Sequence, residues 1–161
     1  MMIKYAGIIA ISCAISIFGA VKASDIKQRS EIRREILRFL SHIESEIKYG
    51  ASPLSEIYFS FKSDLFDKCG FTNALKQGCL YSELIYNTLS DLSSEEKSKL
   101  SEFFSKIGTS YSRDEEISLC RYYISVFESF YETNEKSDKA KAVLYKKLGI
   151  ICALLTAIIL I

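Results

Sequence analysis

The sequence predicts an all-α protein: a cytoplasmic bundle of about six helices, flanked by an N-terminal and a C-terminal transmembrane helix. The 161 residues contain one proline, seven glycines and no tryptophan, which favours helices over sheet. Apolar residues recur every three or four positions through the middle of the chain. Both ends are apolar, and nearly all the charge lies between them.

The two apolar ends predict membrane anchors. Residues 5–21 and 148–161 carry no charged side chain, and helices of those lengths would extend roughly 26 Å and roughly 21 Å. A hydrocarbon core is about 30 Å thick, so the first run nearly crosses it and the second is short. We therefore expect a transmembrane helix at 1–22, a cytoplasmic bundle at 23–147 and a second transmembrane helix at 148–161.

Each predicted span has an alternative. The sequence Val21-Lys22-Ala23 loosely resembles a signal-peptidase site, so the first run could be a cleaved signal peptide. The second run could be a buried core helix, because 10–14 apolar residues suit either environment. Residues 150–161 are nevertheless apolar on every face, whereas a surface helix would show a polar side.

The charges predict an orientation. Residues 22–38 carry a net charge of +3 and residues 136–147 a net charge of +4, whereas the outer ends offer only Lys4. The positive-inside rule then places the middle domain in the cytoplasm and both termini on the outer side of the cell membrane. Residues 39–135 carry a net charge of −7, which disfavours nucleic acid as a partner.

The middle of the chain opens with a predicted helical hairpin. A helix over 24–49 has an apolar stripe at Ile32, Ile36, Phe39 or Leu40, Ile43 and Ile47. We expect Gly50 to end it in the left-handed conformation, and Ser52 to cap a second helix whose first residue is Pro53. The buried face of that second helix is predicted at Leu54, Ile57, Tyr58, Phe61 and Leu65.

Four further helices are predicted after Gly70. They comprise a short helix at 71–76, which Gly78 weakens, a helix at 80–89, and a helix opened by a Ser93–Glu96 capping box and closed by Gly108. The last opens at Ser112 with a second box to Glu115. The inward residues of these helices are predicted to be Leu80, Leu84, Ile85, Leu89, Leu100, Phe103, Phe104, Ile107, Ile117, Cys120, Ile124, Phe127 and Tyr131.

The long helices lack breakers. Residues 113–148 contain no proline or glycine, so the last helix can continue into the second apolar run, with Thr133-Asn134 as its weakest point. The first helix can continue out of the first apolar run in the same way.

No catalytic, cofactor or metal motif is evident in the sequence. His42 is the only histidine, and we interpret it as packed at a helix contact. The acidic clusters Glu95-Glu96 and 114–116 fall in first helical turns, where they favour the helix dipole. Phe59 lies off the apolar stripe and could face a partner. The five cysteines suit free thiols, and we predict no enzyme activity, no cofactor and no metal.

The layout resembles the stage III sporulation protein AB family of endospore-forming bacteria over essentially all residues. The resemblance rests on the basic pair Arg33-Arg34, the string Glu44-x-Glu46-Ile47-x-Tyr49-Gly50-x-x-Pro53-Leu54, the Phe104-x-x-x-Gly108 stretch and the two apolar ends. Two segments depart from the family pattern. Residues 109–116 are apparently one residue longer, and residues 70–78 look shortened.

The resemblance implies a membrane subunit of a secretion-like channel between mother cell and forespore. It implies a cytoplasmic domain similar to the helical F domain of type II secretion proteins, and the ATPase stage III sporulation protein AA as a partner, with other channel subunits. The candidate fold-defining or partner-binding residues are Arg33, Arg34, Glu46, Tyr49, Gly50, Pro53, Leu54 and Gly108. The alternative function is a membrane-bound regulatory or sensory bundle unrelated to secretion, with Cys69, Cys79 or Cys120 responding to redox state.

Overall fold

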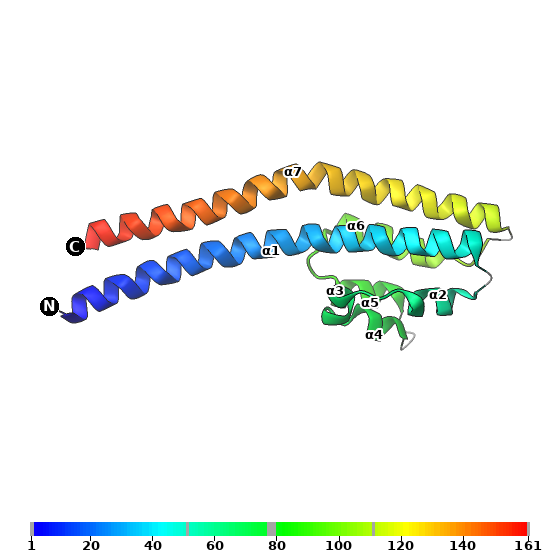
Figure 1. Cartoon of the computed structure of the whole chain (residues 1–161), viewed down its shortest axis with the longest axis horizontal. Helices are drawn as coiled ribbons and strands as arrows, with labels where there is room; N and C mark the ends of the chain where they lie inside the picture. The colour runs from blue at the N-terminus through cyan, green and yellow to red at the C-terminus, as the bar shows by residue number, and fades with distance from the viewer. Residues whose placement is uncertain (1, 51, 77–79, 111, 161) are drawn as a thin grey trace. The chain divides into compact units, whose positions relative to one another are not determined.

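The computed structural model describes residues 2–50, 52–76, 80–110 and 112–160, and all regular secondary structure in those ranges is α-helical. The all-α prediction is confirmed. Along the chain the helices are α1 (Met2–Tyr49), α2 (Leu54–Ser60), α3 (Asp64–Lys68), α4 (Phe71–Lys76), α5 (Tyr81–Thr88), α6 (Ser94–Lys106) and α7 (Arg113–Leu160) (Figure 1).

The chain divides into two compact units. Residues 31–132 form one unit, called the body below, and residues 1–30 with 133–161 form the other, called the arm unit. α1 and α7 are each 48 residues long, and each contributes to both units without a break. This continuity was predicted from the absence of breakers. Within α7 the units divide at Thr133, the predicted weak point.

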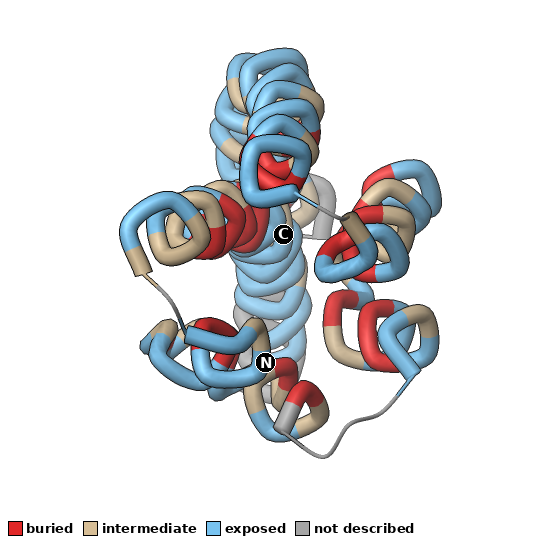
Figure 2. Tube along the Cα trace, turned by 90° about the vertical axis from the view of Figure 1, so that its right-hand side faces the viewer, coloured by how far each residue is buried: buried red, intermediate tan, exposed pale blue. Residues whose placement is uncertain are grey.

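The body is built around the apolar stripe of α1. Ile32, Ile36, Phe39, Leu40 and Ile43 are all at most 2% exposed, so the helical periodicity located the core correctly. Figure 2 shows that buried positions are confined to one side of most helices. The ring of Phe39 lies at the centre of an aromatic cluster whose centroids are 5.0 to 6.2 Å from its own: Tyr58, Phe61, Phe66, Phe71 and Phe104.

The predicted second helix is wrong in its extent. It was expected to run to Leu65, but α2 ends at Ser60, and Phe61 is extended with φ −72° and ψ 120°. Ser63 then caps α3, its hydroxyl oxygen accepting a hydrogen bond from the Phe66 amide at 3.2 Å. The break allows both Phe61 and Phe66 to pack on the ring of Phe39.

The later helices of the body follow the predictions closely. α4 has the predicted bounds, α5 is one residue shorter at each end, and the Ser93–Glu96 capping box is present. Leu80 was predicted to be inward but is 71% exposed, because it lies outside α5 at the N-cap position. Tyr123 is fully buried although the predicted stripe passed over it; it lies three residues after Cys120 on the same face. Gly78 and Cys79 lie outside the described residues.

In the arm unit α1 and α7 approach each other through glycines. A Cβ on Gly19 would lie 2.9 Å from the Cα atom of Gly149 and from the carbonyl oxygen of Tyr145. A Cβ on Gly149 would lie 3.2 Å from the Cα of Gly19. Only glycine allows two helix backbones to come this close, so this pair sets the spacing of the arms. No local pattern in the sequence predicted this contact.

No helix in the described part of the chain combines the length and the apolarity that crossing a bilayer requires. The transmembrane helices predicted at 1–22 and 148–161 are therefore not supported by the structure. The second run was already short, at roughly 21 Å if helical.

Candidate interaction site at the α1–α2 turn

The eight candidate residues lie in two places within the body. Arg33 and Arg34 are in the middle of α1, about four turns before the helix ends at Tyr49. The others lie at the end of α1, at the start of α2 and after α6: Glu46, Tyr49, Gly50, Pro53, Leu54 and Gly108.

Gly50 ends α1 without adopting the left-handed conformation. The glycines with positive φ in the described residues are Gly70 and Gly108, so the predicted left-handed cap at Gly50 is wrong. The Gly50 amide instead donates to the Glu46 carbonyl at 2.7 Å, and a Cβ there would lie 2.7 Å from that same oxygen. Glycine suits this position because the chain passes close to the last helical turn. The Gly50 carbonyl accepts a hydrogen bond from Arg113 at the start of α7.

Pro53, rather than Ser52, occupies the N-cap of α2. Pro53 is extended, with φ −64° and ψ 151°, and so cannot be the first helical residue as predicted. Its carbonyl accepts from the amides of Glu56 at 2.9 Å and Ile57 at 3.2 Å. No side chain caps this helix, so the fixed φ of proline sets the entry of the chain into α2.

Gly108 brings two separate parts of the motif together. Its φ is +79°, a conformation that glycine adopts without penalty, and a Cβ there would lie 2.5 Å from Cδ1 of Leu54. The end of α6 therefore packs against the first residue of α2. The sequence named both residues, but only the structure shows that they touch.

Glu116 is the residue that the sequence reasoning missed. It was interpreted only as a favourable charge in the first turn of α7. Its carboxylate accepts hydrogen bonds from the amides of Gly108 at 2.9 and 3.1 Å and of Ser110 at 3.0 Å, and the residue is 9% exposed. The predicted box at Ser112 is half formed, with its hydroxyl accepting from the Glu115 amide at 3.2 Å. The acidic run 114–116 at the start of α7 was the available signal. It does not show which of the three carboxylates accepts hydrogen bonds from the preceding loop.

Aromatic side chains at and near the turn are exposed. Tyr49 is 77% exposed and Phe59 is 46% exposed, as expected for a residue off the stripe. The ammonium of Lys48 lies 4.8 Å from the centre of the Tyr49 ring. An aromatic ring left in solvent contributes little to the fold of the turn, and exposed aromatics are frequent anchors of protein interfaces.

Arg33 forms a buried ion pair rather than a surface site. Its Nε donates to Glu96 Oε1 at 2.5 Å, joining α1 to α6, and the two side chains are 8% and 1% exposed. The second oxygen of Glu96 accepts from the Ser93 amide at 2.8 Å. Burial alone would raise the pKa of Glu96, but the hydrogen bonds from Arg33 and Ser93 outweigh it and hold that pKa below its usual value. Glu96 therefore joins α6 to α1 and caps α6, in addition to its favourable interaction with the helix dipole.

His42 is held at a helix contact, as interpreted from the sequence. Its Nε2 lies 2.8 Å from Ser60 Oγ, and that hydroxyl donates its one proton to the Ile57 carbonyl. Nε2 must therefore carry the proton and donate to the serine oxygen. Within the described residues, no group of three histidine, cysteine or carboxylate side chains is placed to hold a metal ion.

Comparisons with known proteins give one match. No curated protein and no solved structure matches the chain. The family model for stage III sporulation protein AB matches residues 4–161. The chain therefore belongs to the stage III sporulation protein AB family, and its role lies in stage III of sporulation.

Proposed function

We propose that this chain is a non-enzymatic scaffold subunit of a secretion-like channel complex of sporulation, held at the cell membrane by its arm unit. In this proposal the body faces the cytoplasm of the mother cell and docks the ATPase stage III sporulation protein AA. The body would then play the part that the F domain plays in type II secretion.

The observation that carries the membrane part of the proposal is the apolar surface of the arm unit. Among the described side chains of its two apolar runs, 5–21 and 148–161, ten large aliphatic or aromatic ones are 44 to 70% exposed: Ile11, Ile17, Phe18, Val21, Leu148, Ile150, Ile151, Leu154, Leu155 and Ile158. Burying one such side chain is worth about 1.5–3 kcal/mol, so covering ten half-exposed ones is worth on the order of 10 kcal/mol. A lipid environment would supply that cover, and close glycine contacts such as Gly19–Gly149 are typical of helix pairs in lipid.

The scaffold part is supported by the continuity of α1 and α7. Each is one helix that belongs to both units, so a force or displacement at the arms has an unbroken helical path into the body. The exposed Tyr49 and Phe59 are the candidate contacts for a partner. A docking role needs such surface features and no reactive group.

Recovery of the ATPase with the tagged full chain from detergent-solubilised membranes tests this proposal. We expect the ATPase to copurify, and Tyr49→Ala with Phe59→Ala to reduce its recovery without lowering the melting temperature. A matched control is Tyr86→Ala, which removes another exposed tyrosine (50% exposed) from α5. A chain found entirely in the supernatant after membrane sedimentation, or an ATPase never recovered with it, would contradict the proposal.

The alternative, a redox-responsive regulatory bundle, is disfavoured by the surroundings of two of its three thiols, Cys120 and Cys69. Cys120 is fully buried, and its pKa is raised to about 12 by burial and by the nearby Glu116 and Glu44 carboxylates. Burial also raises the pKa of Cys69, whose thiol donates to the Leu65 carbonyl at 2.9 Å. Reactive cysteines need accessible thiolates. Replacing Cys69, Cys79 and Cys120 by serine should abolish function only under this alternative.

A further inference from the structure

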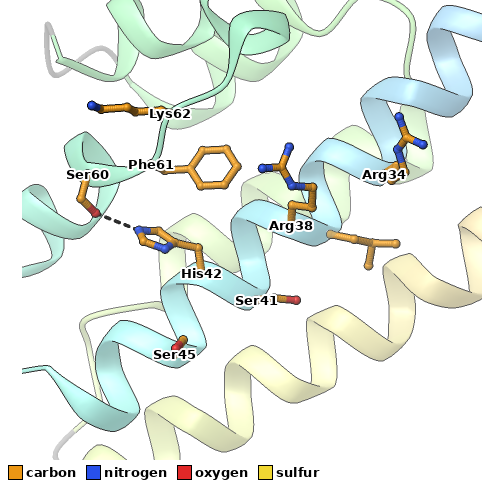
Figure 3. A pocket seen from close by; sticks show the side chains of 9 residues that line it. Arg34, Arg38, Ser41, His42, Ser45, Ser60, Phe61 and Lys62 are labelled. Carbon is orange, nitrogen blue, oxygen red and sulfur yellow. Dashed lines mark hydrogen bonds between the residues drawn. The ribbon is translucent and has the colours of Figure 1, made fainter.

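A groove lined by both polar and apolar side chains runs along one face of α1 in the body. Its volume is about 630 Å³, and α1 lines it with residues at the helical spacing 34, 37–38, 41–42 and 45. The opposite wall is the end of α2 at Ser60 and the following link to α3, with Phe61 and Lys62 (Figure 3). Eleven helical residues separate the ends of the α1 face, so the groove is roughly 17 Å long.

The groove is lined by hydrogen-bond donors and by positive charge. Arg34, Arg38 and Lys62 line it, and no carboxylate does. Arg38 is held in place, because its guanidinium donates to both oxygens of Glu35 at 2.9 and 2.7 Å and lies 5.7 Å from the centre of the Phe61 ring. Among the described residues Arg34 and Lys62 have no ion-pair partner, so two positive charges remain uncompensated there.

The surroundings make this groove distinctive. The body contains 12 Lys/Arg and 17 Asp/Glu, a net charge of −5, so the groove is a positive site on an acidic body. The hydrogen bond from His42 to Ser60 ties the two walls together, which fixes the width of the groove near its middle. A preformed site loses less conformational entropy when a ligand binds.

We propose that this groove binds an acidic, extended segment of a protein partner. Carboxylates suit a site whose lining offers Arg34 and Lys62 and contains no carboxylate of its own. The length of the groove would accommodate about five residues of extended chain at roughly 3.3 Å each, and its cations are spread along it rather than gathered around one point. The inference rests on the proposed function in one respect, which is that the partner of this chain is a protein.

The test uses the full chain in detergent and fluorescein-labelled hexaglutamate as the probe, with hexaglutamine as the neutral reference. Arg34→Glu with Lys62→Glu should weaken hexaglutamate binding at least about tenfold in fluorescence anisotropy at low salt. The matched control, Lys68→Glu with Lys106→Glu, makes the same change in net charge at two residues of the body that do not line the groove, and should alter binding by less than about twofold. Should the reversal disturb folding, Arg34→Gln with Lys62→Gln should still weaken binding more than the corresponding control.

Equal losses of hexaglutamate affinity in the groove variant and in the control would overturn the inference, because the peptide would then respond only to the net charge of the chain. Inorganic phosphate or phosphatidylglycerol vesicles that bind the wild-type chain more tightly than the peptide, and lose binding in the groove variant, would overturn it in favour of a small anion or a lipid. Peptide binding that fails while the ATPase still copurifies overturns this inference alone. Peptide binding that persists without ATPase recovery counts against the proposed function alone.

Discussion

Removing Arg33 should destabilise the body far more than removing a surface arginine. The Arg33 and Glu96 side chains are 8% and 1% exposed, so Arg33→Met leaves a carboxylate buried without its counter-charge. Breaking a buried pair by removing one partner costs about 3–5 kcal/mol. For a chain of this size each kcal/mol shifts the melting temperature by about 2–4 °C, so we expect a loss of about 6–20 °C.

Arg121→Met is the matched control, because Arg121 pairs with Glu44 at 2.7 Å and the two side chains are 59% and 21% exposed. Such a solvent-accessible pair is worth about 0–1 kcal/mol, so the melting temperature of Arg121→Met should fall by no more than about 4 °C. The double variant Arg33→Met/Glu96→Gln should recover much of the loss, since the glutamine can still accept from the Ser93 amide and carries no charge. The assay is thermal unfolding of the full chain in detergent, followed by circular dichroism.

Lowering the pH should narrow the difference in melting temperature between the wild-type chain and Arg33→Met. In the wild type the pKa of Glu96 is lowered from 4.5 in the folded state, so the pair stabilises the fold fully above that value, and the contribution is lost as the pH falls through the lowered pKa. In the variant, burial acts without the arginine and should raise the pKa of Glu96, so protonation relieves the penalty. The result that refutes this is a loss of melting temperature in Arg33→Met no larger than that in Arg121→Met, or a double variant no more stable than Arg33→Met alone.

Three further predictions concern glycines and a thiol. Gly108→Ala should cost about 2–3 kcal/mol and Gly70→Ala about 1–2 kcal/mol in thermal unfolding, because both have positive φ but only Gly108 lies against another side chain; a reversed order would contradict this. In a variant whose other cysteines are replaced by serine, maleimide should label Cys120 only after denaturation, since burial raises its pKa to about 12; labelling of the native chain at the same rate would refute it. Gly149→Leu should push the arms apart and lengthen the distance between spin labels on the two arm cysteines, with the other cysteines replaced by serine; an unchanged distance distribution would count against the contact.

The parts of the fold that were predicted depend on local patterns. The buried stripe of α1 follows from helical periodicity, and the Ser93–Glu96 capping box from a four-residue motif. The continuity of α1 and α7 follows from the absence of breakers. Each of these depends on residues within a few turns of one another, so a single sequence contains the necessary information.

The parts that were missed depend on contacts between distant residues. Arg33 pairs with Glu96 across 63 positions, and Gly108 meets Leu54 across 54, neither of which leaves a local pattern. The conformation of Gly50 was misassigned because a glycine after a helix can serve either a left-handed turn or a close approach of the backbone. The charged groove brings Arg34 on α1 beside the α2–α3 link, and the break that creates this link was itself not predicted.

The most direct test of the scaffold account is binding between purified stage III sporulation protein AA and the full chain in lipid nanodiscs. The account predicts a saturable complex that forms with the wild-type chain, weakens with Tyr49→Ala and Phe59→Ala, and requires no hydrolysis of ATP by the chain itself. A folded chain in nanodiscs that shows no complex with the ATPase, at the highest concentrations both proteins tolerate, would contradict it.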